Sequence, residues 1–281
     1  MPLPATGVKH QHDLTSSQET TMPLTQPPAV EITYIGGPTA VISIAGVTFI
    51  TDPTFDAPGR EYALGKVTLR KLNGPAFPVE HLGKIDVALV SHEQHPDNLD
   101  SAGRALLPRI PLVLSTKHSA ARLGAHALGL DPWDSRMIDT PSGSTLRITA
   151  TPARHGPAGI EPLSGEVIGF LISMDGTDLV YVTGDTVWYE GTAEVARRYQ
   201  PRVVVLFGGA ASARGPFHLT MNTNDAVEAA KAFSNATLVP VHHDGWAHFT
   251  QTQFDIEKTF AALGIADRLQ LVEPGQPMRF Q

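Results

Sequence analysis

The stretch Ser91-His92-Glu93-Gln94-His95-Pro96-Asp97-Asn98-Leu99-Asp100 determines how the rest of the chain is interpreted. It follows the apolar, β-branched run at 85–90, which predicts a buried strand. Two imidazoles and several carboxylates therefore arrive together where a strand ends, which is where α/β proteins keep their chemistry. His92, His95 and Asp97 are close enough in one loop to converge on a single ion. Because neutral imidazole and carboxylate suit borderline divalent metals, the stretch predicts a metal site.

The composition limits the class of protein. The chain has 281 residues, of which 42% are hydrophobic and 17% charged, as is typical of a globular enzyme. A formal charge of −7 without a Lys/Arg-rich run argues against a nucleic-acid partner. No cysteine is present, so any metal must be held by His, Asp, Glu or neutral oxygen. No apolar run reaches the roughly 18 residues of a membrane span, and a signal-peptide core is absent, so we expect a cytoplasmic protein without a membrane partner.

Along the chain, strands come first and helices then alternate with strands. This order of elements occurs roughly twice. Residues 1–28 are rich in Pro, Thr, Ser and Gln and predict a flexible tail, in which Met22 is an alternative start to Met1. Residues 54–82 predict a long irregular loop able to cover one side of a site. Helices are expected at 99–107, 119–128 (ended by Gly129), after a cap at Asn224, and at 252–263. Strands are expected within 30–50 and at 85–90, 111–115, 146–150, 167–174, 178–183, 202–207, 237–241 and 269–272.

The absence of an internal linker predicts one domain. No Gly/Ser-rich segment interrupts residues 29–281. Two mixed sheets with helices on their outer faces account for the pattern of elements. The predicted fold class is therefore α/β (α+β), with the layers of an αββα sandwich.

Four separate strand ends deliver side chains that metals use. Besides the central loop, His155 follows the strand at 146–150, Asp185 follows 178–183 and His242 follows 237–241. A lone buried histidine is more often a satisfied core residue, but four such ends in one chain favour a shared site. Without a cation, an acid such as Asp185 at the end of a buried strand would be a poorly compensated charge.

As an ordered set, these motifs resemble the metallo-β-lactamase fold superfamily. Its signature is His-x-His-x-Asp-His after a strand, then a single His, a bridging Asp and a final His. More narrowly, residues 29–281 look like the branch that contains the ascorbate-6-phosphate lactonases and related metal-dependent hydrolases. The motifs that carry the narrower likeness are Thr51-Asp52-Pro53, Asp97-Asn98-Leu99-Asp100, Thr183-Gly184-Asp185-Thr186, Gly208-Gly209, Leu219-Thr220-Met221 and Pro240-Val241-His242.

The resemblance implies a role for each matching residue. His155 would bind the first metal, Asp185 would bridge two metals, and His242 would bind the second. Asp97 would bind the second metal and would also orient or deprotonate the attacking water, which makes it the catalytic residue. Asp52 matches an acid behind the ligands that fixes a ligand imidazole.

The central loop departs from the family motif. With the aspartate in register, His95 takes the second histidine position, Glu93 falls on the first, and Asn98 replaces the last. His92 is one residue out of frame and reaches the site if the loop bulges, so His92, Glu93 and Gln94 are alternatives for the first position. Because Asn98 offers only a neutral oxygen, the second site is predicted to be weak, oxygen-rich and suited to manganese, or empty. Together with Asp100, which closes the same motif, Asn98 is then expected behind the ligands.

Side chains of neighbouring loops are expected at the mouth of the site. Arg154 is predicted to bind an anionic group such as phosphate or carboxylate, with a surface ion pair as the alternative. His218, Trp246 and His248 are predicted to contact substrate or to protonate the leaving group. Their alternative is an ordinary loop position satisfied by neighbouring residues.

These observations predict a metal-dependent hydrolase that acts on a small-molecule ester, lactone or phosphoester. A divalent ion lowers the pKa of bound water from about 16 to about 7, which makes hydroxide available at neutral pH. One or two ions per chain are expected, zinc first, with manganese or iron as alternatives. The rival hypotheses are a single-metal binding or sensing member of the fold and a phosphodiesterase or nuclease. A homo-oligomer is a further expectation.

Overall fold

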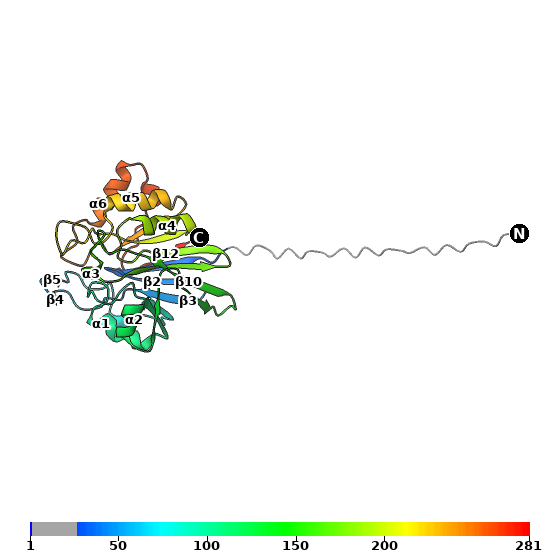
Figure 1. Cartoon of the computed structure of the whole chain (residues 1–281), viewed down its shortest axis with the longest axis horizontal. Coiled ribbons are helices and arrows are strands. Elements are labelled where there is room, and N and C mark those ends of the chain that lie inside the picture. The colour runs from blue at the N-terminus through cyan, green and yellow to red at the C-terminus, as the bar shows by residue number, and fades with distance from the viewer. Residues whose placement is uncertain (2–26) are drawn as a thin grey trace.

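The computed structural model describes Met1 and residues 27–281. Two β-sheets pack face to face, and helices cover the outer face of each (Figure 1). This arrangement confirms the predicted αββα layers. Almost all of the tail predicted at 1–28 lies outside the described residues. Within the described part of the chain, no helix has the length and apolar character needed to cross a lipid bilayer.

The first sheet combines an antiparallel half with a parallel half. Its seven strands are, in spatial order, β15 (Pro277–Phe280), β1 (Val30–Gly36), β2 (Thr39–Ile44), β3 (Val47–Thr51), β6 (Val87–Leu89), β7 (Leu112–Thr116) and β8 (Ala127–Leu130). From β15 to β3 the neighbours pair antiparallel, whereas β3, β6, β7 and β8 run parallel. The carboxyl ends of β3 and β6 therefore lie at the same edge of the sheet.

The second sheet repeats this plan with six strands. In spatial order they are β14 (Thr237–Val241), β13 (Val203–Phe207), β12 (Thr177–Val182), β11 (Ile168–Met174), β10 (Thr145–Pro152) and β9 (Ser135–Asp139). Strands β12, β13 and β14 run parallel, and β11 is antiparallel to both β10 and β12. Consequently β10, β12 and β14 all end at one edge.

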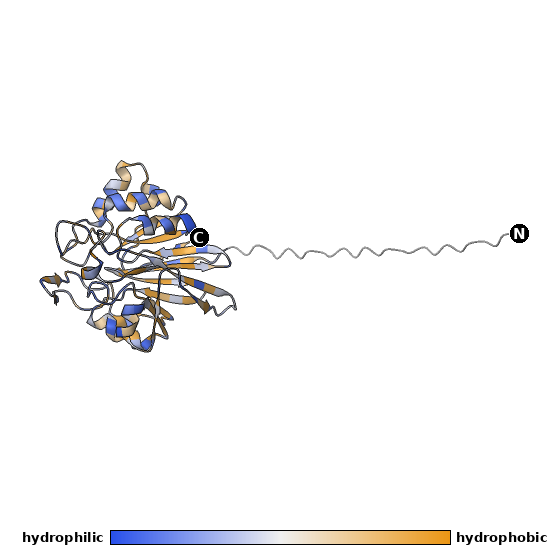
Figure 2. Cartoon of the chain, viewed as in Figure 1, coloured by the Kyte–Doolittle hydropathy of each residue, from blue (hydrophilic) through white to orange (hydrophobic). Residues whose placement is uncertain are grey.

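The main core lies between the two sheets. Side chains such as Ile42 and Phe49 from the first sheet and Ile148 and Phe170 from the second belong to one cluster of buried residues. Figure 2 shows the strands as the hydrophobic centre, with hydrophilic residues concentrated on the outer helices. Strand β13 is buried along its whole length, as expected of a parallel strand covered on both faces.

The helices form the two outer layers. The helices α1 (Ser101–Leu106) and α2 (Lys117–Leu123) lie against the first sheet, and α4 (Glu190–Arg198), α5 (Thr223–Ala232) and α6 (Gln253–Ala262) lie against the second. The one-turn helix α3 (Glu161–Ser164) follows β10. Short 3₁₀ turns occur at η1 (Val79–His81), η2 (Leu107–Arg109) and η3 (Ala266–Arg268).

Two helix boundaries differ from the sequence prediction. The helix expected at 119–128 is α2, which already ends at Leu123 because Gly124 adopts a φ of 98° there. The residues that follow form β8 instead. In α5 the cap is Asn222, not Asn224, and its side chain accepts a hydrogen bond from the amide of Asp225 at 2.9 Å.

Two segments also differ in kind. Residues 54–82 contain the β-hairpin of β4 (Glu61–Leu64) and β5 (Val67–Arg70), which pair only with each other and turn at Gly65, where φ is 64°. The strand expected at 269–272 is wrong: Leu269 makes only an isolated bridge to Leu238, and the final strand is β15. Leu269 packs against the cluster that contains residues of α5 and α6, whereas Val272 belongs to the core between the two sheets.

Candidate metal centre

Three imidazole nitrogens meet beyond the ends of β6 and β10. His92 Nε2 lies 2.9 Å from His95 Nδ1, and His155 Nε2 lies 3.1 Å from the same nitrogen. All three rings are buried. Burial, reinforced by the neighbouring imidazoles, lowers the pKa of His155 to about 3 and that of His92 well below its usual value. The rings are therefore neutral at pH 7, the form in which imidazole binds a metal.

Hydrogen bonds on the far side of two rings fix their orientation. His155 Nδ1 donates to the carbonyl oxygen of Leu219 at 2.8 Å, which leaves the lone pair of Nε2 directed at the cluster. The hydroxyl of Ser91 lies 2.9 Å from His92 Nδ1 and holds that ring in the same way. Such partners behind the ligands are typical of metal-binding histidines.

The structure places His92, rather than Glu93 or Gln94, beside the other two histidines. The Glu93 carboxylate pairs with Arg104 and Arg122 on the outer side of the loop. The amide of Gln94 donates to the carbonyl oxygen of Ser164 at 3.0 Å. The loop therefore accommodates one extra residue between its histidines, and the register that puts Glu93 on the first position is wrong.

A second cluster lies next to the first and is richer in carboxylate. His242 Nε2 is 3.7 Å from Asp97 Oδ2 and 3.5 Å from Asp185 Oδ1. The other oxygen of Asp185, Oδ2, is 3.7 Å from His155 Nε2 in the first cluster. Asp185 thus lies between the two clusters, with one oxygen toward each.

The charges of the second cluster are not compensated by other described residues. Both Asp185 oxygens, both ring nitrogens of His242 and Asp97 Oδ1 are buried without a hydrogen-bond partner there. Burial first, and then the charges of Asp97 and Asp52, raise the pKa of Asp185 well above its usual value. Burial acts on Asp97 too, but the neighbouring imidazoles of His242 and His248 hold its pKa well below the usual range. A divalent cation fits this donor set, because it would contact the unpartnered atoms and offset the buried charge.

Two backbone features bring the strand ends together. Gly184, with a φ of 62°, precedes Asp185, and a Cβ on it would lie 2.7 Å from the Ile168 carbonyl oxygen and 2.9 Å from Ser91 Cβ. Only glycine lets the end of β12 approach the histidine loop this closely. His242 itself adopts a φ of 56°, a conformation rare for residues other than glycine, and its amide donates to the carbonyl oxygen of Gly37 at 2.7 Å.

The three residues expected behind the ligands have different surroundings. Asp52 accepts a hydrogen bond from the Ser91 amide at 2.6 Å, so it reaches His92 through Ser91 and not directly. Asn98 is fully buried near the carboxylates of Asp52 and Asp185, and its amide nitrogen and oxygen lack hydrogen-bond partners in the described chain.

Asp100 faces away from the metal-type side chains. Its carboxylate accepts from the amide of Gly103 at 2.8 Å, which caps α1, and from Lys71 Nζ at 2.8 Å. Lys71 is 3% exposed and Asp100 1%, so this is a buried ion pair that joins the root of the hairpin to α1. The position of Asp100 is accordingly structural.

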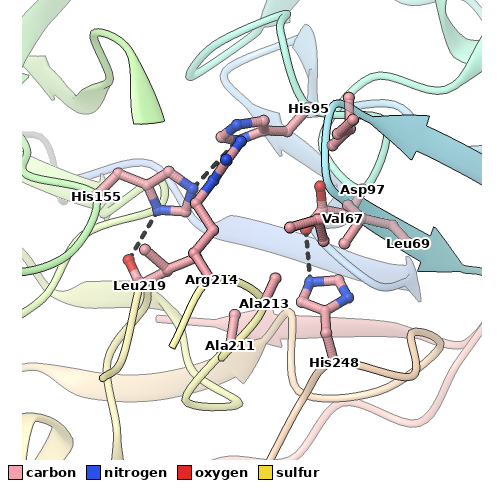
Figure 3. A pocket seen from close by; sticks show the side chains of 11 residues that line it. Val67, Leu69, His95, Asp97, His155, Ala211, Ala213, Arg214, Leu219 and His248 are labelled. Atoms are coloured by element: carbon pink, nitrogen blue, oxygen red, sulfur yellow. Dashed lines mark hydrogen bonds and ion pairs between the residues drawn. The ribbon is translucent and has the colours of Figure 1, made fainter. Parts of the chain in front are cut away.

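A pocket opens above the clusters (Figure 3). Its walls are lined by Leu64, Val67 and Leu69 of the β4–β5 hairpin, by Ala211, Ala213, Arg214 and Leu219 of the loop after β13, and by His95, Asp97, His155 and His248. His248 Nε2 lies 2.9 Å from Asp97 Oδ2. Arg214 was not predicted, because it lies in a loop with no strand or motif to mark it.

The other residues predicted at the mouth are not brought to this pocket. Arg154 stacks over Tyr189, with its guanidinium carbon 4.4 Å from the ring centroid, and lines a neighbouring cavity. His218 is exposed and does not line the pocket. Trp246 is buried, and it packs behind His248 at a ring distance of 6.2 Å. Their predicted contacts with substrate are therefore unsupported by the geometry.

The sequence and the fold match known proteins over most of the chain. Residues 48–243 match the family model described as the beta-lactamase superfamily domain. A UPF0173 metal-dependent hydrolase of Pelotomaculum thermopropionicum is 30% identical over 69% of this chain and 82% of its own length. The UPF0173 protein YddR of Bacillus subtilis is 26% identical over 89% of this chain and its whole length.

A solved structure shares the fold. The isothiocyanate hydrolase from Delia radicum gut bacteria is 24% identical and superposes with a TM-score of 0.77, covering 89% of this chain and 99% of its own. At this level of identity the likeness is one of fold. The matches confirm the resemblance to the superfamily, while the narrower likeness to the ascorbate-6-phosphate lactonases stays a prediction.

Proposed function

Because the chain belongs to the metallo-β-lactamase superfamily, we propose that it is a hydrolase that depends on one or two divalent metal ions and cleaves a small ester, lactone or phosphoester. The observation that carries the proposal is the position of Asp185, which directs one oxygen at each of two buried donor clusters. His92, His95 and His155 would hold one ion, and Asp97, Asp185 and His242 the other. The three-imidazole set suits zinc, and the oxygen-rich set suits zinc, manganese or iron.

Each residue has a distinct task in this proposal. When bound, a divalent ion supplies Lewis acidity and lowers the pKa of water toward neutrality. Asp97 Oδ1 has no hydrogen-bond partner among the described residues, so it is the oxygen available to hold the attacking water or accept its proton. Asp97 Oδ2 is engaged by His248, which fixes the orientation of the carboxylate. No side chain needs to act as nucleophile.

The apolar lining of the pocket supports a small substrate with an apolar part. The hairpin contributes Leu64, Val67 and Leu69 to its wall. A second candidate reaction, hydrolysis of an isothiocyanate, is favoured by the same apolar wall, since isothiocyanates are small, apolar electrophiles.

The decisive experiment combines elemental analysis with a substrate panel. The purified protein would be analysed for zinc, manganese and iron per chain, and assayed with aryl esters, lactones, aryl phosphoesters and an aryl isothiocyanate. We expect at least one ion per chain and turnover of one substrate class that disappears after chelation and returns with added metal. A chain that binds ions but turns over none of these compounds would favour the sensing alternative. Salt-dependent binding of DNA or RNA would favour a nuclease.

A further inference from the structure

We propose that Arg214 is the anion receptor of the pocket and that the substrate carries a negatively charged group beside an apolar body. This inference rests on the proposed function, because it assigns the substrate class of the same site. Figure 3 shows the Arg214 side chain extending from its loop toward His95 and His155. It is the one cationic side chain among the described residues that line the pocket, apart from the histidines.

The guanidinium of Arg214 has no protein counter-ion within the described residues. The acids of this region are engaged elsewhere: Glu93 pairs with Arg104 and Arg122, and Asp97 is bonded by His248. No ion pair or side-chain hydrogen bond joins Arg214 to another described residue. A guanidinium carries five donors in a planar fork that matches carboxylate, sulfonate and phosphate oxygens. An unpaired fork directed into a pocket therefore points to an anionic ligand group.

The charge of the metal centre strengthens the argument. Asp97 and Asp185 bring two negative charges, which balance one divalent ion. The charge of Arg214 is then an additional positive charge beside the same centre. An anionic group of the substrate would offset this additional positive charge.

The loop that carries Arg214 is anchored at its base. The Ala211 amide donates to Thr220 Oγ1 at 2.9 Å, and the Leu219 amide donates to the Ala211 carbonyl oxygen at 2.8 Å. The Ser212 amide donates to the carbonyl oxygen of His248 at 2.9 Å. Ala211 and Leu219 also pack with Ile160 in a small buried cluster. These contacts hold the backbone on both sides of Arg214, so its side chain is presented to the pocket from a fixed base.

The opposite wall accounts for the apolar body of the substrate. Leu64, Val67 and Leu69 come from the β4–β5 hairpin, and Val67 and Leu69 lie across the pocket from Arg214 (Figure 3). A molecule with a short aliphatic or aromatic part and one anionic end satisfies both walls. The bond to be cleaved would then lie over the metal centre between them.

A pair of matched probes tests the inference without requiring turnover. Benzenesulfonate is an anion that coordinates metals weakly, and methyl phenyl sulfone is a neutral compound of nearly the same shape. Binding of both to the metal-loaded protein would be measured by calorimetry for the wild type, Arg214→Gln and Arg214→Lys. Arg136→Gln, on the exposed edge strand β9, removes the same charge far from the pocket and serves as the control.

We expect Arg214→Gln to weaken benzenesulfonate binding about tenfold or more, Arg214→Lys to weaken it less, and neither to change binding of the sulfone. Arg136→Gln should behave as the wild type. The inference is overturned if the wild type does not bind the sulfonate, if Arg214→Gln binds it unchanged, or if both probes lose affinity equally. Metal content measured on the same samples separates this inference from the proposed function. Absence of metal would contradict the metal-dependent hydrolase, whereas the comparison of the two probes would still decide the role of Arg214.

Discussion

The two halves of the metal centre differ in what the protein supplies. The first half, His92, His95 and His155, is made of three neutral imidazoles whose nitrogens are already within 3.1 Å of a shared one. The second half, Asp97, Asp185 and His242, has two carboxylates and one imidazole at 3.5 to 3.7 Å, with most of its donor atoms unpartnered. The first half resembles a site fixed by the protein, and the second depends on a cation for its charge balance.

The comparison shows that the replacement of the motif's last histidine by Asn98 affects only the second half of the metal centre. The family motif ends in a histidine at the position of Asn98, which would add an imidazole to the second half. The extra residue between His92 and His95 is absorbed by the loop, so it leaves the first half complete. We therefore expect the first half to bind its ion more tightly than the second.

The largest effect should come from removing one imidazole from each half. His155→Ala takes away one of three neutral ligands, and we expect loss of the first ion and a fall in kcat/KM of about a thousandfold or more. His242→Ala should remove the second ion and leave the first in place. Elemental analysis and kcat/KM, with circular dichroism as the control for folding, measure both. Full metal content in both variants would show that the two halves do not bind metal.

A smaller loss should follow from His248→Ala. His248 bonds Asp97 Oδ2, so without it the carboxylate is less well oriented, and we expect kcat to fall about 10- to 100-fold with unchanged metal content. Because the hydrogen bond helps to hold the pKa of Asp97 low, its loss should also move the acidic limb of the pH profile to higher pH. His248→Gln, which keeps a donor, should recover part of the rate. An unaltered kcat and pH profile would assign His248 to packing alone.

The inequality of the two halves is tested directly by Asn98→His. An imidazole at this buried position should raise the affinity of the second ion about tenfold, bringing the second half closer to the family pattern. Asn98→Ala is the matched control, since it removes the amide without adding a ligand. Titration of the metal-free protein with zinc, followed by calorimetry, gives both affinities. If stoichiometry and affinity do not change, the alignment that places Asn98 on the last histidine of the motif is incorrect.

The stability of the metal-free protein should depend on pH through Asp52, which lies behind the histidine half. Burial, against hydrogen bonds from Ser91, raises the pKa of Asp52 to about 8, whereas the unfolded value is 3.8. The folded state therefore holds this proton more tightly, and the free energy of unfolding should fall as pH rises from about 4 to about 8, by at most roughly 1.4 kcal/mol per unit. Asp52→Asn should lack this component. Urea unfolding at several pH values measures it, and parallel profiles for both proteins would contradict it.

The smallest effect is expected for Glu93→Ala. Glu93 pairs with two half-exposed arginines on the outer side of the loop, so its loss should leave both ions bound and cost only about 1 kcal/mol of stability. Elemental analysis and thermal unfolding are sufficient. Loss of one ion in this variant would restore Glu93 to the first position of the motif.

Much of the fold and of the site could be predicted because both follow from patterns of neighbouring residues in the sequence. Apolar runs such as 203–207 mark buried strands, and the metal-type side chains follow directly after them. The hairpin at 61–70 was missed because each of its strands has only four residues and alternates weakly. The structural role of Asp100 was visible in principle, since an aspartate before a short helix is an N-cap signal.

The mouth of the site could not be predicted because long-range contacts decide where loop side chains point. His218 and Leu219 are neighbours in sequence, yet the Leu219 carbonyl holds His155 while the His218 side chain faces outward. Arg214 is placed at the pocket by a loop whose ends are joined through Ala211 and Thr220 and whose Ser212 is bonded to the distant His248. Neither the orientation of His218 nor the position of Arg214 can be predicted from spacing along the chain.

The β4–β5 hairpin offers a way in which such a protein could change its substrate specificity. It contributes apolar lining to the pocket but none of the metal-type side chains, and it is fastened at its base through Lys71 and through the Ala247 amide on the Arg70 carbonyl oxygen. Its turn, at Gly65, contributes none of the side chains of the two metal-type clusters. Changes in the length or residue type of the hairpin tip can therefore alter which molecules enter the pocket. The metal-type side chains beneath it would keep their positions.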